Sequence, residues 1–270
     1  MQFNRENGLD RPLSLQYVYW LSGAVRGKFG ISFQNRMPVG PDIARRLPVT
    51  MELALLGFLI ANVIAVPLGA LAALFHQRHT DTVISGLATV FGAVPNFWLA
   101  TLLVLLFAVT WHLLPAGGYV PLLSHPIRNL ERMTLPALSL GLASSGLLTR
   151  IMRAVMLETL TSDYIRTAYG KGASRWVVLL RHALRNALIP FLTVGAVEFG
   201  FLFGSVVIIE DIFRLPGIGS LVLVGIINRD YPVLLASSLV VTVAVLAANL
   251  AADLAASLLD PRQVRSQGAG

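Results

Sequence analysis

The sequence has no cysteine and little charge. Of its 270 residues none is Cys and only 13% are Asp, Glu, Lys or Arg, whereas 55% are hydrophobic. Without Cys the chain can form no disulfide, thiolate metal site or cysteine nucleophile. An ordinary soluble domain has about twice this charged fraction. The composition therefore excludes a typical water-soluble globule and indicates a membrane protein.

Motifs for energy conversion and catalysis are also missing. A phosphate-binding loop needs the pattern GxxxxGK[ST], and the nearest stretch, Gly23–Phe29, is one residue short and ends in Phe. His76 and His79 have only Asp81 as an acidic neighbour, which does not predict a metal site. No nucleophile and base are paired in the sequence. We expect no catalytic residue, no metal site and no ATP hydrolysis in this chain.

Five apolar segments are long enough to cross a bilayer, which requires about 20 mainly apolar residues. An all-α polytopic membrane protein is the fold class that they predict. The third segment is short and can extend past Arg150 and Arg153 to Leu160. The expected spans are roughly Thr50–Phe75, Val83–Thr110, Thr134–Thr149, Ala187–Ile209 and Val233–Leu259. Each of the first four contains a proline that favours a kink, namely Pro67, Pro95, Pro136 and Pro190.

The position of the basic residues predicts the orientation, because Lys and Arg concentrate in cytoplasmic loops. The net charge of +7 therefore does not indicate nucleic acid binding. The connection between the third and fourth spans is the most basic and belongs in the cytoplasm. Residues 1–49 then face outside, and since no hydrophobic signal precedes their basic residues, we expect a further span upstream. In this segment Leu13–Trp20 suits either a helix on membrane lipid or a simple outer cap.

The cytoplasmic connection contains a recognisable pattern. Residues 162–190 read SDYIRTAYGKGASRWVVLLRHALRNALIP, which predicts two short amphipathic helices joined by a turn. Ser162 or Asp163 caps the first helix and Ser174 caps the second. Gly172 ends the first helix in a left-handed conformation. From the amphipathic pattern alone, this connection could also be a basic loop lying on anionic lipid.

This connection resembles the permease subunits of ABC importers, in their dipeptide, oligopeptide and nickel branch. That branch has the pattern DYxRTAxAKG followed by HxLRNxxxP. Gly170 replaces the usual Ala, and elsewhere Lys28 stands where the pattern GDxG has Asp. The stretches RLPVTMELALL, VPNFWLATLLVLLFA, LPAGGY and LLDPR are similar to the same branch. The matching residues are Asp163, Tyr164, Arg166, Thr167, Ala168, Lys171, Gly172, His182, Leu184, Arg185, Asn186 and Pro190.

The resemblance implies a fold, a location and a set of partners. The fold is a type I ABC importer transmembrane domain at residues 50–261, with the family's first span missing and residues 262–270 as a cytoplasmic tail. The location is the bacterial cytoplasmic membrane. The partners are a second homologous permease, two ATPase subunits that bind ATP and Mg, and an external substrate-binding protein. The coupling segment is about 161–190, and its residues for the ATPase contact are Asp163, Tyr164, Arg166, Thr167, Ala168, Lys171 and Gly172.

The substrate implied by the resemblance is a di- or oligopeptide, with nickel and glutathione as alternatives in the same branch. Glu198 lies midway along the fourth span and is a candidate for the translocation pathway, since ionisable groups inside spans are functional candidates. It could equally pair with a partner subunit, and a satisfied structural carboxyl is the third possibility. Asp253 is expected to be structural. The connection Glu210–Val233 resembles an external gate with a short re-entrant or interfacial helix. An ATP-independent secondary transporter is the competing class.

Overall fold

The computed structural model describes residues 12–259, except for the side chains of Ala252, Asp253 and residues 255–259. The described chain is helical throughout, apart from turns and one isolated β-bridge between Ile31 and Pro38. Its elements are α2 (Leu13–Val25), α3 (Val39–Leu74), α4 (His79–Ala93), α5 (Asn96–Leu103), the π-helix η1 (Val104–Thr110), α6 (Pro126–Leu160), α7 (Asp163–Gly170), α8 (Arg175–Val177), the π-helix η2 (Val178–Ala183), α9 (Leu184–Ile212), α10 (Ile218–Ile227) and α11 (Tyr231–Leu259).

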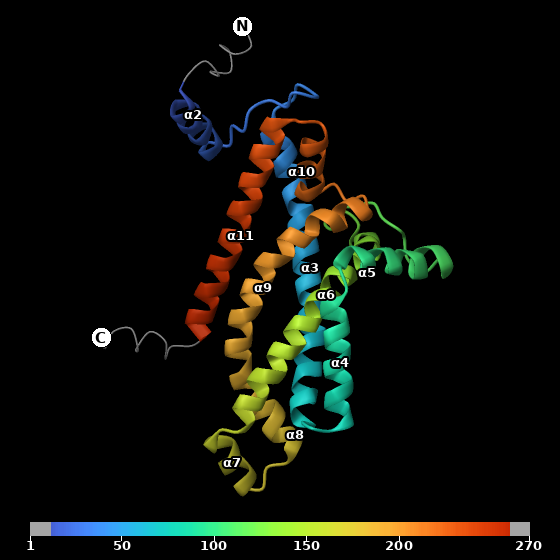
Figure 1. Cartoon of the computed structure of the whole chain (residues 1–270), viewed down its shortest axis with the longest axis vertical. Helices are drawn as coiled ribbons and strands as arrows, with labels where there is room; N and C mark the ends of the chain where they lie inside the picture. Colours follow the sequence, from blue (N-terminus) through green and yellow to red (C-terminus); the bar gives the residue numbers. More distant parts are fainter. Residues whose placement is uncertain (1–11, 260–270) are drawn as a thin grey trace, which may run out of the picture.

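The long helices run side by side along the length of the molecule (Figure 1). α6 packs against α3, α4 and α9, and α11 packs against α9. α7 and α8 lie at one end of the bundle, whereas α10 lies at the opposite end. The predicted all-α polytopic fold is confirmed, and the coupling segment and the gate region lie at opposite ends, as expected from the orientation.

Within residues 12–259, four helices are long and apolar enough to cross a membrane: Val39–Leu74, Pro126–Leu160, the continuous helix Arg175–Ile212, and Tyr231–Ala251. The predicted second span, Val83–Thr110, is not one continuous helix. α4 and the helix Asn96–Thr110 are bent by 99° relative to each other. The break falls where Val94 adopts an extended conformation before Pro95, because a residue that precedes proline disfavours the helical region.

One further boundary differs from the prediction and another agrees with it. α3 begins at Val39, so the expected division at residue 49 falls inside a continuous helix. Val39 and Ile43 are buried in a cluster with residues of α10 and α11, and this packing extends the helix beyond the apolar span. α6 continues to Leu160 and includes Arg150 and Arg153, as the sequence allowed.

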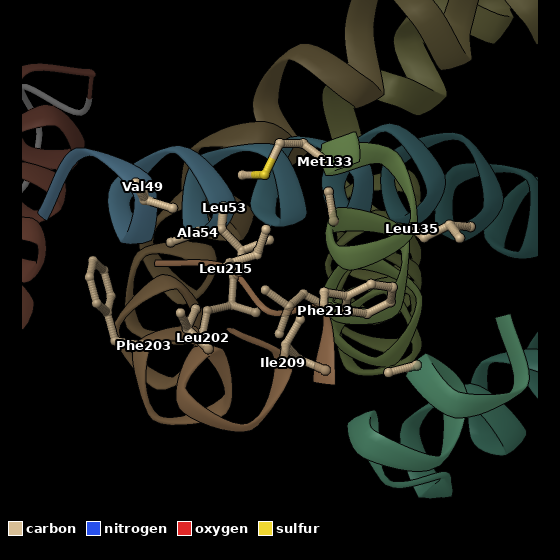
Figure 2. Close-up of a cluster of buried hydrophobic side chains, with 14 residues drawn as sticks. Val49, Leu53, Ala54, Met133, Leu135, Leu202, Phe203, Ile209, Phe213 and Leu215 are labelled. Carbon is tan, nitrogen blue, oxygen red and sulfur yellow. The ribbon is translucent and has the colours of Figure 1, made fainter. Parts of the chain in front are cut away.

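The core between α3, α6 and α9 lies toward the end of the bundle that carries α10 (Figures 1 and 2). Leu53, Met133 and Phe213 are fully buried in it. Close approach of the helices depends on small residues: a Cβ on Gly141 would lie 2.6 Å from Ile60 Cγ2, and one on Gly146 would lie 2.4 Å from the carbonyl oxygen of Ala88. Glycine at such positions lets helix backbones pack closely in membrane proteins.

Candidate functional site

The predicted coupling residues lie together on α7 and the turn that follows it. Ala168 is partly buried, whereas the other six are exposed. Ile165 is fully buried among residues of α3, α6, η2 and α9. Ile165, with Ala168 packed against the same cluster, holds α7 to the bundle and leaves its polar and aromatic face open at the end of the molecule.

The turn after α7 requires glycine. Gly172 has a φ of +82°, in the left-handed region that side chains disfavour. Its amide donates to the carbonyl of Tyr169 at 2.9 Å, and the amide of Ala173 donates to the carbonyl of Ala168 at 3.2 Å. These two hydrogen bonds form a Schellman motif, which satisfies carbonyls at the helix end. The predicted role of Gly172 in ending the helix is confirmed.

The predicted serine caps are wrong in their side-chain contacts. Ser162 and Ser174 occupy the N-cap positions of α7 and α8, but neither side chain caps its helix. The Ser162 hydroxyl instead donates to the carbonyl of Thr159 at 2.6 Å, in the turn that ends α6. Asp163 lies in the first turn of α7, where a carboxylate interacts favourably with the positive end of the helix dipole.

The second short helix is also not separate, which corrects the prediction of two short helices. α8, η2 and α9 form one continuous helix, Arg175–Ile212. Of the apolar residues on its first turns, Leu179, Ala183 and Ala187 are buried, but Trp176 and Leu180 are exposed. The coupling segment is therefore joined without a break to the fourth membrane span.

Arg175 fixes this segment to the end of α3. Its guanidinium donates a hydrogen bond to the carbonyl of Leu74 and lies 5.1 Å from the centre of the Phe75 ring. The Phe75 and Trp176 rings meet edge to face at 6.5 Å. A cation at the carboxyl end of a helix interacts favourably with the helix dipole. Arg175 and Leu74 are 101 positions apart, so no local pattern in the sequence indicates the contact.

A second polar contact at this end joins α4 to α6. Arg153 donates to both carboxylate oxygens of Asp81, from Nε at 2.6 Å and from Nη2 at 2.8 Å. His76 Nδ1 lies 3.1 Å from the same carboxylate. A bidentate arginine–carboxylate pair is strong and directional, so it holds the α3–α4 turn against α6. Among the described residues no group of three or more His, Cys, Asp or Glu could hold a metal ion.

Glu198 lies far from the coupling residues, about 35 Å along the continuous helix from Arg175 at 1.5 Å per residue. It is half-buried, and the Ser144 side chain of α6 lies beside its carboxylate. Ser144 gives this mid-span carboxylate a polar neighbour within its own chain. Asp253 lies among the residues whose side chains are not described.

The opposite end of the continuous helix carries a residue that the sequence did not single out. Glu210 is fully buried, and its Oε1 accepts a hydrogen bond from Thr50 Oγ1 at 2.6 Å. Its Oε2 accepts one from the Ser220 amide at 2.9 Å, while Thr50 Oγ1 accepts one from the Ile218 amide at 2.8 Å. Glu210 and Thr50 thus bind the first turn of α10, whose amides have no partner within the helix. The short helix predicted in the gate region is confirmed as α10, and α3 and α9 hold it.

The LPAGGY stretch forms a loop that closes over this core. The amide of Gly118 donates to the carbonyl of Phe213 at 2.9 Å, and a Cβ on Gly117 would lie 2.3 Å from that oxygen. Tyr119 donates from its hydroxyl to Glu52 Oε2 at 2.9 Å. Burial, together with this hydrogen bond, raises the pKa of Tyr119 to about 12, so it stays a neutral donor at physiological pH.

Asp230 holds the outer turn at residues 30–38. Its carboxylate accepts hydrogen bonds from Ser32 Oγ at 2.5 Å and from the amides of Phe33 and Gln34 at 3.2 and 3.4 Å. Burial opposes ionisation, but the hydrogen bonds from Ser32 and the backbone amides outweigh it, so the pKa of Asp230 lies below its ordinary value. Asp230 therefore joins the segment before α3 to the corner between α10 and α11.

Comparison with known proteins identifies the family. Residues 65–265 match the family described as the binding-protein-dependent transport system inner membrane component. The chain belongs to this family. A peptide transport system permease protein of Brucella abortus (strain 2308) is 43% identical over 95% of this chain and 82% of its own length. The dipeptide transport system permease protein DppB of Escherichia coli (strain K12) is 34% identical over 97% of this chain and 84% of its own length.

A solved transporter chain has a similar fold. A chain of the MetNI methionine ABC transporter, in an inward-facing conformation, aligns with a TM-score of 0.68 at 15% identity, covering 81% of this chain and 96% of that chain. Family membership, these relatives and this fold confirm the prediction of an inner-membrane permease subunit of an ABC importer. They do not favour the secondary transporter.

Proposed function

We propose that this permease subunit imports di- or oligopeptides and takes its energy from two partner ATPase subunits. The relatives from Brucella abortus and Escherichia coli are named as peptide and dipeptide permeases, which supports this substrate class over nickel or glutathione. A second homologous permease completes the pathway, and an external binding protein delivers the peptide. ATP and Mg bind on the ATPase subunits, because the chain has no phosphate-binding loop.

The observation that carries this proposal is the attachment of α7 to two long helices. α7 presents an exposed face with Tyr164 and Tyr169, and aromatic side chains of this kind are frequent anchors at protein interfaces. Behind it, Arg175 binds the end of α3 and begins the continuous helix Arg175–Ile212. Coupling between sites requires an element whose positions are differently bound by a partner. α7 meets that requirement when an ATPase subunit holds it.

The same helix connects the coupling segment to the outer end. At 1.5 Å per residue its 38 residues extend about 57 Å, from Arg175 to the turn after Glu210. A movement of α7 on ATP binding then shifts α9 and, through Glu210, the first turn of α10. The outer and inner ends of the pathway thus change together, as alternating access requires.

Glu198 is the proposed contact of this chain with the peptide. It lies between the two ends on the helix that moves, and its carboxylate can meet the cationic amino terminus of a peptide. The neighbouring Ser144 side chain is placed to orient the carboxylate in the peptide-free state. Ionisable groups within spans are costly to bury, and a functional role explains why one is kept.

The test is uptake of a radiolabelled dipeptide into vesicles that contain the purified transporter, with its binding protein outside and ATP inside. We expect uptake that requires both ATP and the binding protein. Glu198→Gln should raise the peptide concentration needed for half-maximal uptake without changing binding-protein affinity, whereas the exposed control Glu158→Gln should behave as wild type. Uptake that continues without ATP, driven by an ion gradient, would contradict the proposed function.

A further inference from the structure

Helix α2 has an unusual combination of composition and exposure. Its 13 residues, LSLQYVYWLSGAV, include no charged side chain. Among the described residues only Ala24 of this helix is buried. Val18 is 59% exposed and Val25 is 82% exposed. A helix that presents so much apolar surface to water is unfavourable unless something covers it.

The position of α2 indicates what covers it. In Figure 1 it stands apart from the bundle, at the level of the outer end of α11. The chain that follows α2 reaches α3 through the turn that Asp230 holds. The C-terminal end of α2 is therefore tethered to a fixed point at the outer end of the spans. Since α11 is long and apolar enough to cross a membrane, we expect its outer end to lie near the level at which the hydrocarbon layer gives way to lipid headgroups.

The composition of α2 fits that level. Tyr17, Tyr19 and Trp20 follow one another closely, and tyrosine and tryptophan are enriched at membrane–water interfaces. Arg26 and Lys28 come directly after the helix, where they can pair with anionic headgroups. At 1.5 Å per residue the helix is about 20 Å long, too short to cross a hydrocarbon layer of about 30 Å.

We propose that α2 lies in the outer interface of the membrane, with Leu15, Val18 and Val25 in contact with lipid. At 100° per residue these side chains share one face, opposite a face that contains Trp20 and Ala24. On this second face Trp20 is partly buried and Ala24 is buried, whereas Leu13 is 81% exposed, so the chain covers only part of it. α2 would then anchor the outer segment of this chain to the membrane independently of the peptide pathway.

The absence of native cysteine makes the proposal directly testable by spin labelling. The labels would be placed at Val18→Cys and Val25→Cys, with Asn35→Cys in the exposed outer turn as the aqueous control and Ala24→Cys as the protein-facing control. The transporter would be purified with its partner subunits and inserted into vesicles of phosphatidylethanolamine and phosphatidylglycerol. Labelling of the unsubstituted chain in the same complex gives the background.

We expect the labels at 18 and 25 to collide more with oxygen than with a water-soluble nickel chelate, at a depth of about 5–10 Å below the headgroup boundary. The label at 35 should show the reverse. Low collision with both reagents at 18 and 25 would mean that protein covers this face, and preferential collision with the nickel chelate would mean that water does. Either result would overturn the lipid contact.

Discussion

The guanidinium of Arg175 donates a hydrogen bond to the carbonyl of Leu74, so the segment that follows α7 is bonded to the end of α3. Arg175 also lies over the ring of Phe75. These contacts connect the short exposed helix to two membrane spans: α3 by hydrogen bonding, and α9 because Arg175 begins the same continuous helix.

The first prediction concerns this contact. Arg175→Gln removes a charge-assisted hydrogen bond, whose contribution is about 1.5–3 kcal/mol, and the ring contact with Phe75. We expect the number of peptides transported per ATP hydrolysed to fall about tenfold, within the range typical of coupling energies. Arg181→Gln is the matched control, because it removes the same charge from an exposed position on the same helix. Equal transport stoichiometry in the two variants, measured in vesicles, would refute the role of Arg175.

The second prediction concerns the turn at Gly172. A side chain in the left-handed region costs about 1–2 kcal/mol, and valine is among the least tolerant of it. Gly172→Val should therefore leave the protein in the membrane but abolish peptide uptake. Gly170→Val is the control, because a Cβ at either glycine meets nothing within 4 Å and only Gly172 has a positive φ. Normal uptake by Gly172→Val would exclude the coupling role of this turn.

The third prediction tests the anchoring of α10. Thr50→Val leaves the Ile218 amide without its acceptor and removes a donor from Glu210. An unpaired buried polar group costs about 1–3 kcal/mol, so thermal unfolding in detergent should begin at a lower temperature. Thr50→Ser should restore most of the loss because it keeps the hydroxyl. Thr89→Val, at an exposed residue bonded only within its own helix, should have little effect.

The apolar segments and the glycine turn could be predicted from the sequence because both depend on local chemistry. Length and hydropathy fix a span, and an exposed turn that ends a helix favours glycine. The bend at Val94–Pro95 was only partly predictable, since proline in α6 and α9 leaves the helix continuous. Whether the helix breaks or continues is decided by its packing.

The contacts that define the site could not be predicted because their partners are far apart along the chain. Glu210 and Thr50 are 160 positions apart, and Arg153 and Asp81 are 72 apart. Ser162 shows the limit even of a local rule. Its position as N-cap was correct, but its hydroxyl has a competing acceptor in the carbonyl of Thr159, as serine side chains often do.

The fourth prediction concerns pH. The pKa of Asp230 is lower in the folded protein than its ordinary value of about 3.9. The unfolded state therefore binds the proton more readily, and folding stability rises with pH through this range. The contribution is fully present above the ordinary pKa and is lost as pH falls through the folded value. Hydrogen exchange at the Phe33 and Gln34 amides should be protected at pH 7 and less so below pH 4, after correction for intrinsic rates.

Asp230→Asn is the control for that measurement. It cannot ionise, so the protection of these two amides should be weaker than in the wild type at pH 7 and should not change with pH. A wild-type protein whose protection is the same at pH 7 and pH 3 would show that the carboxylate does not hold the outer turn.

The central claim is that α7 contacts an ATPase subunit, and cross-linking from this helix tests it most directly. Thr167→Cys places a thiol on the exposed face of α7 in a chain without other cysteines, and Asn35→Cys places one at the opposite end. With a short photoactivatable cross-linker on each thiol, we predict a product with the ATPase subunit from position 167 and none from position 35. If the purified complex contains the ATPase but position 167 gives no such product, the account is wrong.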